Sequence, residues 1–314
     1  MSKENTAVTK KKIKRCKEDV VFDAACFIIL TLVLFVVAYP LYWVIISSIS
    51  APSAVSSGKV LLHPIGFTLK GYAEVFKNDQ VMRGFLNSLI ITFCGVMVNL
   101  IVTLPTSYAL SRSNFSGKKP ITIFYLITMF FGGGLIPTYL VIQRLQMLNT
   151  IWALILPGCL SVYNMIVART FFKSNISEEL YEAAEIDGCT QARFFFQIAL
   201  PLSKAIIAIL VLYYGVGHWN SYFSALVYIS DKAKYPLQLV LRNILITNQT
   251  ALSQTATTAA ARAALQEKQQ LIDVMKYSLI IISSIPVLVM YPLVQKHFVK
   301  GVMIGSMKLS LIHI

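Results

Sequence analysis

The chain has 314 residues, of which 56% are hydrophobic and only 13% are charged, and its formal net charge is +14 at pH 7. A water-soluble domain of this size cannot hide so much apolar surface in its core, so the composition excludes an ordinary soluble protein and indicates a membrane protein. The basic residues lie between long apolar runs and are not mixed with aromatic residues on a compact domain, which argues against nucleic acid as a partner. Five scattered cysteines without a CxxC pair indicate neither a disulfide framework nor a metal site.

Six apolar segments are long enough to cross a membrane as helices. A span needs roughly 20 mostly apolar residues, because an α-helix rises about 1.5 Å per residue and the hydrocarbon layer is about 30 Å thick. The predicted spans cover residues 24–49, 88–110, 121–141, 151–168, 205–229 and 277–295. None contains Asp, Glu, Lys or Arg, as expected where an unpaired charge is costly. The sequence therefore predicts an all-α, polytopic membrane protein with about six transmembrane helices, its permease domain spanning residues 24–297.

The basic residues also predict the side of the membrane on which each connection lies. Seven of them precede the first span: Lys3, Lys10, Lys11, Lys12, Lys14, Arg15 and Lys17. Segments rich in Lys and Arg are retained in the cytoplasm, so the basic tail of residues 1–23 is expected inside. An even number of spans returns the C-terminal tail, residues 298–314, to the same side. The connection of residues 172–203 then lies in the cytoplasm, and the long connections of residues 50–87 and 230–276 lie outside.

The second outer connection carries a further helical pattern. Pro236 opens a run of leucines and valines with helix-like spacing beside Arg242, which favours a helix lying at the membrane interface. A plain solvated connection is the alternative. Residues 250–270 are rich in Ala, Thr and Gln and predict a polar helix leading into the last span.

The cytoplasmic connection between the fourth and fifth spans has the most distinctive sequence. Ser177 is placed to cap a short helix, with Glu178 and Glu179 in its first turn at the positive end of the helix dipole. The small side chains of Ala183 and Ala184 would let the surface of another protein approach this helix closely.

A glycine break and a second helix follow. Asp187-Gly188 ends the first helix, because glycine readily adopts the left-handed conformation of a tight C-terminal turn. The second helix is expected from about Thr190 and ends at Leu200-Pro201. Its predicted apolar face consists of Phe194, Phe195 and Ile198.

The spacing in this loop resembles the signature of binding-protein-dependent ABC importer permeases, which reads Glu-Ala-Ala, three residues, Gly, nine residues, Ile, one residue, Leu-Pro. The matching residues are Glu182, Ala183, Ala184, Gly188, Ile198, Leu200 and Pro201. The resemblance implies the type I ABC importer permease fold. It also implies that these residues, together with Asp187, form the coupling element that docks on a cytoplasmic ATPase subunit and passes its closing motion to the spans.

Other stretches are similar to the carbohydrate-importing subgroup, close to the maltose-type and complex-polysaccharide permeases. They are Asn87-Ser88, residues 219–223, Tyr235-Pro236-Leu237 and residues 298–302. The resemblance implies a sugar importer in the bacterial plasma membrane. Its implied partners are a homologous second permease, a dimer of ABC ATPases and an extracellular solute-binding protein. Permeases for amino acids, peptides or ions share the loop and remain the alternative.

The chain itself is predicted to be neither an enzyme nor a cofactor-binding protein. A phosphate-binding loop needs GxxxxGK followed by Ser or Thr. Gly66 and Gly71 have the glycine spacing, but Tyr72 and Ala73 stand where the lysine and the hydroxyl would be. ATP and magnesium are therefore expected on the partner ATPase. An ion-coupled secondary transporter is a weaker alternative, because no span contains a carboxylate.

Polar and aromatic residues inside the spans are candidates for the translocation pathway. A hydrogen-bonding group is costly in lipid unless it faces protein or water. Amides would bond sugar hydroxyls and aromatic rings would stack on sugar faces, while the alternative is that these residues lock helices together. The predicted pathway residues are Asn99, Tyr163, Asn164, His218, Trp219, Asn220 and Tyr222. The run of glycines at 132–134, with Pro137 and Pro286, is expected to permit close packing and kinks.

Overall fold

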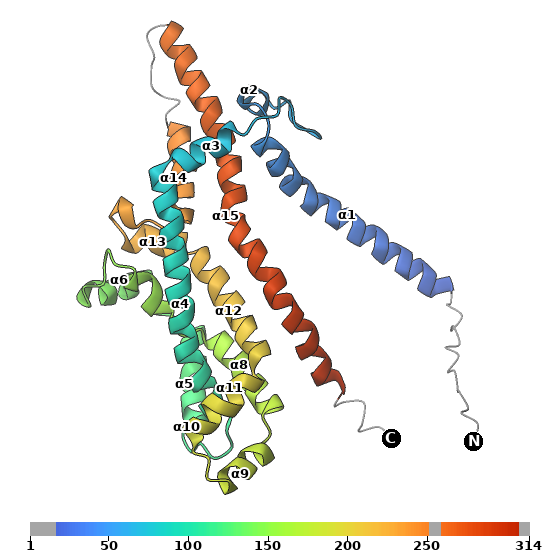
Figure 1. The fold of residues 1–314 in the computed structure, drawn as a ribbon, viewed down its shortest axis with the longest axis vertical. Coiled ribbons are helices and arrows are strands. Elements are labelled where there is room, and N and C mark those ends of the chain that lie inside the picture. Colours follow the sequence, from blue (N-terminus) through green and yellow to red (C-terminus); the bar gives the residue numbers. More distant parts are fainter. Residues whose placement is uncertain (1–16, 251–258, 308–314) are drawn as a thin grey trace.

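The computed structural model describes residues 17–250 and 259–307, and every regular element within these ranges is a helix (Figure 1). The predicted all-α class is therefore confirmed. Most of the predicted basic tail, residues 1–16, lies outside the described residues. So do residues 251–258 and residues 308–314.

Three helices are long and apolar enough to cross a membrane unaided. They are α1 (Lys17–Ser48), α4 (Asp79–Ser111) and, within α15 (Ala259–Met307), the segment Gln269–Pro292. They correspond to the first, second and sixth predicted spans. All three continue through internal prolines, which are Pro40, Pro105, Pro286 and Pro292. α15 also runs on past residue 297, so the predicted C-terminal tail begins as a continuation of the last helix.

The third predicted span is not one continuous helix. It is divided between α5 (Lys118–Phe130) and α6 (Leu135–Arg144), which meet at 113°. The chain turns at the glycine run, where Gly134 has φ 83°. Glycine adopts this backbone region at no steric cost, so the predicted kink lies at the glycine run, where the chain turns too sharply for one continuous helix.

The fourth and fifth spans are broken as well. α7 (Trp152–Ile155) and the short 3₁₀ helix η1 (Leu156–Gly158) precede α8 (Val162–Asn175) with a bend of 51°. α12 (Lys204–Trp219) stops near the middle of the fifth predicted span, and α13 (Tyr222–Tyr228) completes it. If each bent pair that passes as a span is counted once, the described part of the chain has up to six spans.

Short helices fill the connections. The connections predicted to lie outside hold α2 (Pro52–Ser56), α3 (Lys70–Lys77), the 3₁₀ helix η3 (Lys232–Lys234) and α14 (Leu237–Thr250). The connection between the fourth and fifth spans holds α9 (Glu178–Ile186), α10 (Gln191–Phe194), the π-helix η2 (Phe195–Ala199) and α11 (Leu200–Leu202).

The apolar stripe of α14, from which an interfacial helix was predicted, is buried against the protein over its first turns. Leu237 and Val240 are fully buried, in a cluster with residues of α4 and α15 such as Val81 and Leu279. α14 can lie this close because α4 has a glycine at the contact: a Cβ added to Gly84 would stand 3.0 Å from a methyl carbon of Val240. The apolar stripe thus serves helix packing within the protein.

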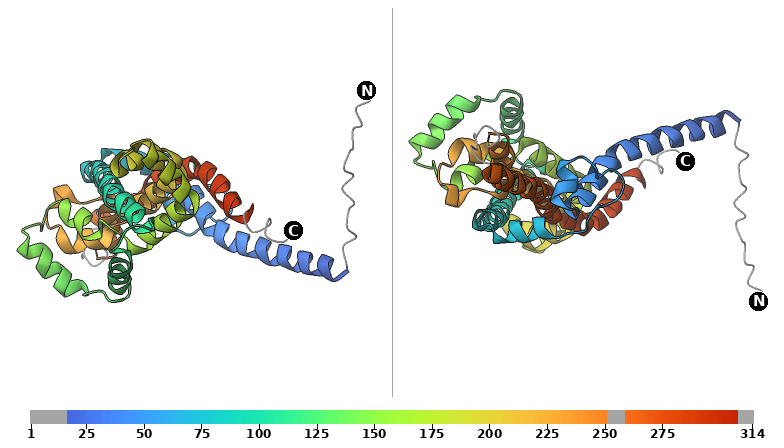
Figure 2. Two further views of the ribbon diagram at one scale, coloured as in Figure 1. Left: turned by 90° about the horizontal axis from the view of Figure 1, so that it is seen from below. Right: turned by 90° about the horizontal axis from the view of Figure 1, so that it is seen from above.

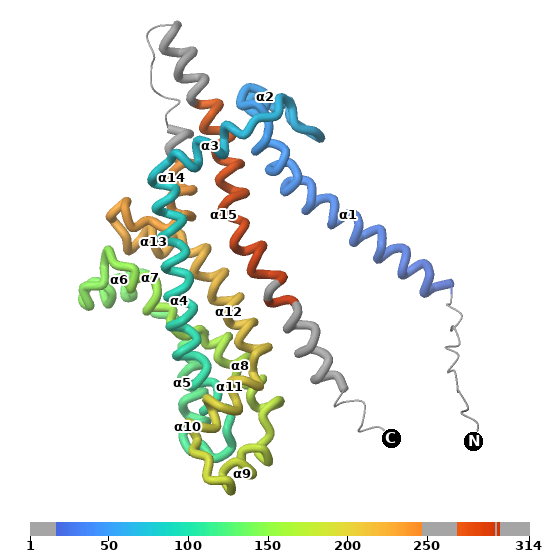
Figure 3. Tube along the Cα trace, in the orientation of Figure 1, coloured from blue at the N-terminus to red at the C-terminus, as the bar shows by residue number. Residues whose placement is uncertain are grey.

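The body of the molecule forms around α4. Helices α8, α12, α14 and α15 contact it or one another along its length (Figure 1). α9 lies at one end of the body and α2, α3 and the start of α14 lie toward the other, as the tube in Figure 3 also shows.

α1 leaves this body, and the end views in Figure 2 show it projecting to one side. Only its last turns are held: Trp43 Nε1 donates to the carbonyl oxygen of Val60 at 2.8 Å, and its ring packs edge-on against Tyr277. From Lys17 to Ile45 no residue of α1 is buried within the chain, and Ile46, Ser47 and Ser48 at its end are buried.

Candidate functional site

The coupling loop, residues 172–203, is capped as the sequence predicts. The hydroxyl oxygens of Ser177 and Thr190 each accept a backbone N–H from the first turn of α9 and α10, both at 3.3 Å. Gly188 has φ 76°, and its N–H donates to the carbonyl oxygen of Glu185 at 3.0 Å. α9 therefore ends in the expected left-handed glycine turn.

One face of α9 points away from the protein. Glu182, Ala183 and Asp187 are exposed, and the side chain of Tyr181 is buried against the body. Ile186 is 87% exposed. The exposed face combines a carboxylate, a small residue and a protruding aliphatic side chain. Ile186 was missed at the sequence level, where attention fell on the signature positions.

The second helix of the coupling loop is less regular than predicted. Its apolar face is confirmed, since Phe194 and Phe195 are buried, and Ile198 packs beside them. The helix widens into the π-helix η2 before Leu200 and Pro201, a form often associated with functional sites. From Gln191–Leu202 to α12 the chain bends by 80°.

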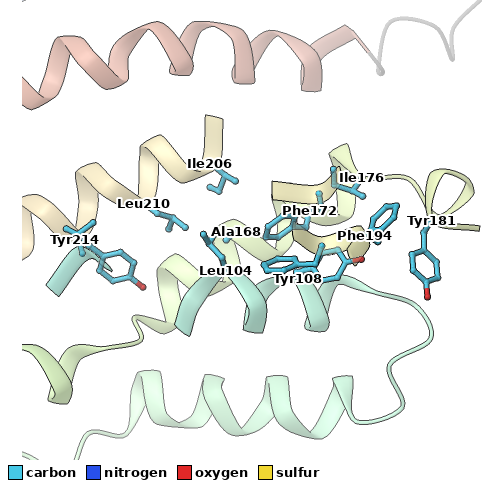
Figure 4. Packing of buried hydrophobic residues seen from close by; sticks show 13 residues of the cluster. Leu104, Tyr108, Ala168, Phe172, Ile176, Tyr181, Phe194, Ile206, Leu210 and Tyr214 are labelled. Atoms are coloured by element: carbon cyan, nitrogen blue, oxygen red, sulfur yellow. The ribbon is translucent and has the colours of Figure 1, made fainter. Parts of the chain in front are cut away.

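A cluster of aromatic rings joins the coupling loop to α4. Tyr108, near the end of α4, packs against Phe172 of α8 and Phe195 of η2, with ring centroids 5.6 and 5.0 Å apart (Figure 4). Tyr181 of α9 meets Phe194 edge-on at 5.2 Å. Rings from three parts of the coupling loop thus surround one residue that precedes the loop by more than sixty positions.

Arg112 directly follows α4 and extends this connection. Its Nη2 donates to the carbonyl oxygens of Phe172 at 3.3 Å and Ile176 at 3.0 Å, at the end of α8. Its guanidinium lies over the ring of Tyr108 at 5.1 Å, and Nη1 is 3.7 Å from Oε2 of Glu178 in α9. Sequence reasoning missed Tyr108 and Arg112 as site residues, because an arginine at the end of a span ordinarily indicates only the cytoplasmic side.

Three of the predicted pathway residues are engaged in contacts between helices. Asn99 is fully buried: Nδ2 donates to the carbonyl oxygen of Gly158 at 2.7 Å, and Oδ1 is 2.7 Å from Nε2 of His218. A Cβ on Gly95 would stand 2.5 Å from the His218 ring, so the glycine makes room for the histidine. Trp219 is also buried and donates to a carbonyl oxygen of α15 at 2.9 Å.

The other four residues differ in exposure. Asn164 is buried, whereas Tyr163 and Tyr222 are 55% and 45% exposed. Asn220 is exposed, and its Nδ2 donates to a carbonyl oxygen of its own helix. It lines a cavity of about 430 Å³ between the end of α12, α14 and α15. The polar residues around this cavity are Asn220, Gln238, Ser283 and Ser284. The last three were missed, since single polar residues in these helices carry no motif.

A polar latch holds residues 233–237 onto α4. Asn87 Nδ2 donates to the carbonyl oxygens of Ala233 at 2.8 Å and Tyr235 at 3.1 Å. The hydroxyl of buried Ser88 accepts the N–H of Leu237 at 2.8 Å, which caps α14 from a neighbouring helix. Two stretches that resembled the carbohydrate subgroup, Asn87-Ser88 and residues 235–237, are therefore in direct contact. Within residues 17–250 and 259–307 no three His, Cys, Asp or Glu side chains gather to hold a metal ion.

Comparisons with known proteins cover nearly the whole chain. The polygalacturonan/rhamnogalacturonan transport system permease protein YtcP of Bacillus subtilis strain 168 is 36% identical over 287 residues, which are 91% of this chain and 98% of that protein. Protein LplC of the same organism is 38% identical over 288 residues, 92% of this chain and 95% of that protein. The galactooligosaccharides transport system permease protein GanQ of that organism is 29% identical over 292 residues, covering 90% and 94%.

A solved structure has the same fold. It is the crystal structure of a bacterial ABC transporter involved in the import of the acidic polysaccharide alginate, one chain of which matches with a TM-score of 0.81 and 27% identity, over 91% of this chain and 100% of that one. The type I importer permease fold implied by the coupling loop is thereby confirmed. A profile described as "binding-protein-dependent transport system inner membrane component" matches residues 64–304. The chain therefore belongs to the family of inner membrane components of binding-protein-dependent transport systems.

Proposed function

We propose that this chain is the permease subunit of an ATP-driven importer of oligosaccharides. The observation that carries the proposal is the near full-length similarity to permeases named for sugars, at 36% identity for a polygalacturonan/rhamnogalacturonan system and 29% for a galactooligosaccharide system. The alginate importer supports it through the fold. Importers of amino acids or peptides are the alternative class, and no relative named above favours it.

The proposed assembly contains four kinds of component. This chain pairs with a homologous second permease, a dimer of cytoplasmic ATPases binds below them, and an extracellular binding protein delivers the sugar. ATP and magnesium are bound by the ATPases, and this chain holds no cofactor and catalyses no reaction. Lipid of the bacterial plasma membrane covers the outward apolar faces, and both termini lie in the cytoplasm.

The exposed face of α9 is the proposed contact with the ATPase. A short, capped helix ending in a fixed glycine turn transmits displacement, whereas an unstructured loop would absorb it. Ile186, 87% exposed, would enter an apolar pocket of the ATPase, and Glu182 would remain at the polar rim. Closure of the ATPases around ATP would move α9 and, through it, the spans.

The cavity beside Asn220 is the proposed place where this subunit meets sugar. Its amides and hydroxyls suit the hydroxyl groups of a saccharide. The exposed rings of Tyr163 and Tyr222, which do not line this cavity, would stack on the apolar faces of a sugar elsewhere along the pathway. Asn99, His218 and Trp219 would then support the pathway by fixing α12 against its neighbours, as their hydrogen bonds favour.

The decisive experiment is reconstitution of the whole complex in proteoliposomes with its binding protein. We expect ATP hydrolysis to rise several-fold with an oligosaccharide, and uptake of that oligosaccharide to require ATP. Oligogalacturonate, alginate oligosaccharide and galactooligosaccharide are the first probes. Stimulation by an amino acid or peptide alone would overturn the sugar assignment, and uptake driven by an ion gradient without ATP would overturn the importer class.

A further inference from the structure

Arg112 connects α4 to the coupling loop through noncovalent contacts, because α4 and the coupling loop are not adjacent in the chain. α8 and α12 flank the coupling loop in the chain, so displacement of α9 reaches them directly. α4 ends more than sixty residues before α9 begins. It can follow α9 only through contacts between side chains or between side chain and backbone.

These contacts converge at the first residue of α9. Oε1 of Glu178 accepts the backbone N–H of Ser113 at 3.1 Å, and Oε2 lies 3.7 Å from Nη1 of Arg112. The arginine side chain is 11% exposed and the carboxylate 40% exposed, so the pair is only partly screened by water. Arg112 simultaneously holds the carbonyl oxygens at the end of α8, where Ile176 is the nearer partner at 3.0 Å.

The aromatic cluster around Tyr108 makes one connection between α4 and the coupling loop, and the polar contacts of Arg112 and Glu178 make a second beside it. A cavity of about 260 Å³ lies between α4 and the coupling loop, and Arg112, Glu178 and Tyr181 are among the residues that line it. Across this gap the polar contacts of Arg112 and Glu178 bridge the two elements. The aromatic cluster around Tyr108 lies alongside (Figure 4).

We propose that Arg112 is a positioning residue that ties α9 to α4 through Glu178, so that ATP-driven displacement of the coupling loop moves α4 together with α8 and α12. The inference rests on the proposed function. α4 also carries Asn99, whose contact with His218 extends the effect to α12 at the middle of the body.

The test compares two arginines that both join α4 to α8. Arg169 of α8 donates from Nε to the carbonyl oxygen of Leu110 at 2.9 Å, and no described contact takes it to α9. Lysine keeps the charge but cannot hold several partners in the planar fork of a guanidinium. Both Arg112→Lys and Arg169→Lys therefore disturb hydrogen bonds between α4 and α8. Only Arg112→Lys also weakens the contact with Glu178 of α9. Glu178→Gln, at a partly exposed carboxylate, breaks the ion pair with little risk to folding.

We expect the amount of oligogalacturonate imported per ATP hydrolysed to fall several-fold in Arg112→Lys and Glu178→Gln, with the complex still assembled and hydrolysing ATP. Arg169→Lys is expected to keep the ratio of the unmodified complex. An unchanged ratio in Glu178→Gln, or an equal loss in Arg169→Lys, would overturn the proposal.

A sugar-independent measurement separates this proposal from the proposed function. Spin labels are placed on exposed positions of the two elements, Ile101→Cys in α4 and Glu185→Cys in α9, in a complex without other cysteines. With Glu178 intact, we expect the distance between the labels to stay constant when ATP is added. In the Glu178→Gln complex, we expect that distance to change when ATP is added. A distance that changes equally in both complexes contradicts the tie even if no sugar is transported.

Discussion

Gly188 has a backbone conformation that few side chains adopt. Its φ is 76°, and a Cβ added to it would meet nothing within 4 Å, so substitution there is opposed by backbone strain and not by a clash within this chain. A branched residue in the left-handed region costs about 1–2 kcal/mol, whereas asparagine tolerates it. We predict that Gly188→Val distorts the end of α9 and reduces co-purification of the ATPase, while Gly188→Asn retains most of it.

Comparing these two variants distinguishes backbone strain at position 188 from a steric clash between the new side chain and the ATPase. Both add a side chain of similar size to the same open position. Equal loss of ATPase binding in Gly188→Asn and Gly188→Val would show that the partner occupies the space beside the glycine, and would contradict the conformational explanation.

The sequence predicted the roles of residues that bond backbone groups close to them in the chain. It did not predict contacts between residues that are far apart in the chain. Ser177, Thr190 and Gly188 act on backbone groups within a few positions, so their roles follow from capping rules. Asn99 and His218 are 119 positions apart, and nothing in either local sequence indicates the hydrogen bond between them. The same holds for the contacts of Arg112, which depend on how α4, α8 and α9 assemble.

At the scale of elements, hydropathy predicts which segments are apolar and how long they are, but not where a segment bends or by how much. The third predicted span has the right number of apolar residues, yet α5 and α6 meet at 113°. The glycine run signalled a kink, but its size depends on the φ of Gly134, which the sequence leaves free. The stripe of α14 shows the same limit: an apolar helical face fits lipid or protein equally well, and only the neighbouring α4 decides.

The docking of α14 provides a test at this scale. The N–H of Leu237 has no partner within its own helix, and the buried hydroxyl of Ser88 accepts it at 2.8 Å. Ser88→Ala leaves a buried donor unpaired, which costs about 1–3 kcal/mol. We predict faster hydrogen–deuterium exchange across residues 231–244, with little change in α8.

Ser56→Ala is the matched control for this measurement. Ser56 is exposed, and its hydroxyl donates only to a carbonyl oxygen of its own short helix at 3.3 Å. Its exchange pattern is expected to match that of the unmodified protein. Equal protection of residues 231–244 in Ser88→Ala and Ser56→Ala would mean that packing of Leu237 and Val240 holds α14 without the latch.

At the scale of the whole molecule, composition alone predicted that apolar surface exceeds what the chain can bury. The structure shows where the excess lies: no residue of α1 before Ile46 is buried. α1 projects from a body whose other helices pack around α4 (Figure 2). Lipid and the neighbouring permease are the coverings consistent with the proposed assembly, because a soluble monomer would leave this surface in water.

The placement of the chain across the membrane gives a final prediction. α9 lies at the end of the body opposite α2 and α3, and the N-terminal charges predict that the α9 end is cytoplasmic (Figure 1). Single cysteines at exposed loop positions, in a background without the native cysteines, report this directly. We expect a membrane-impermeant maleimide to label Ser56→Cys and Lys232→Cys in intact cells, and Asn114→Cys only after permeabilisation. The reverse pattern would place the coupling loop outside, where no ATPase could reach it, and would contradict the proposed importer.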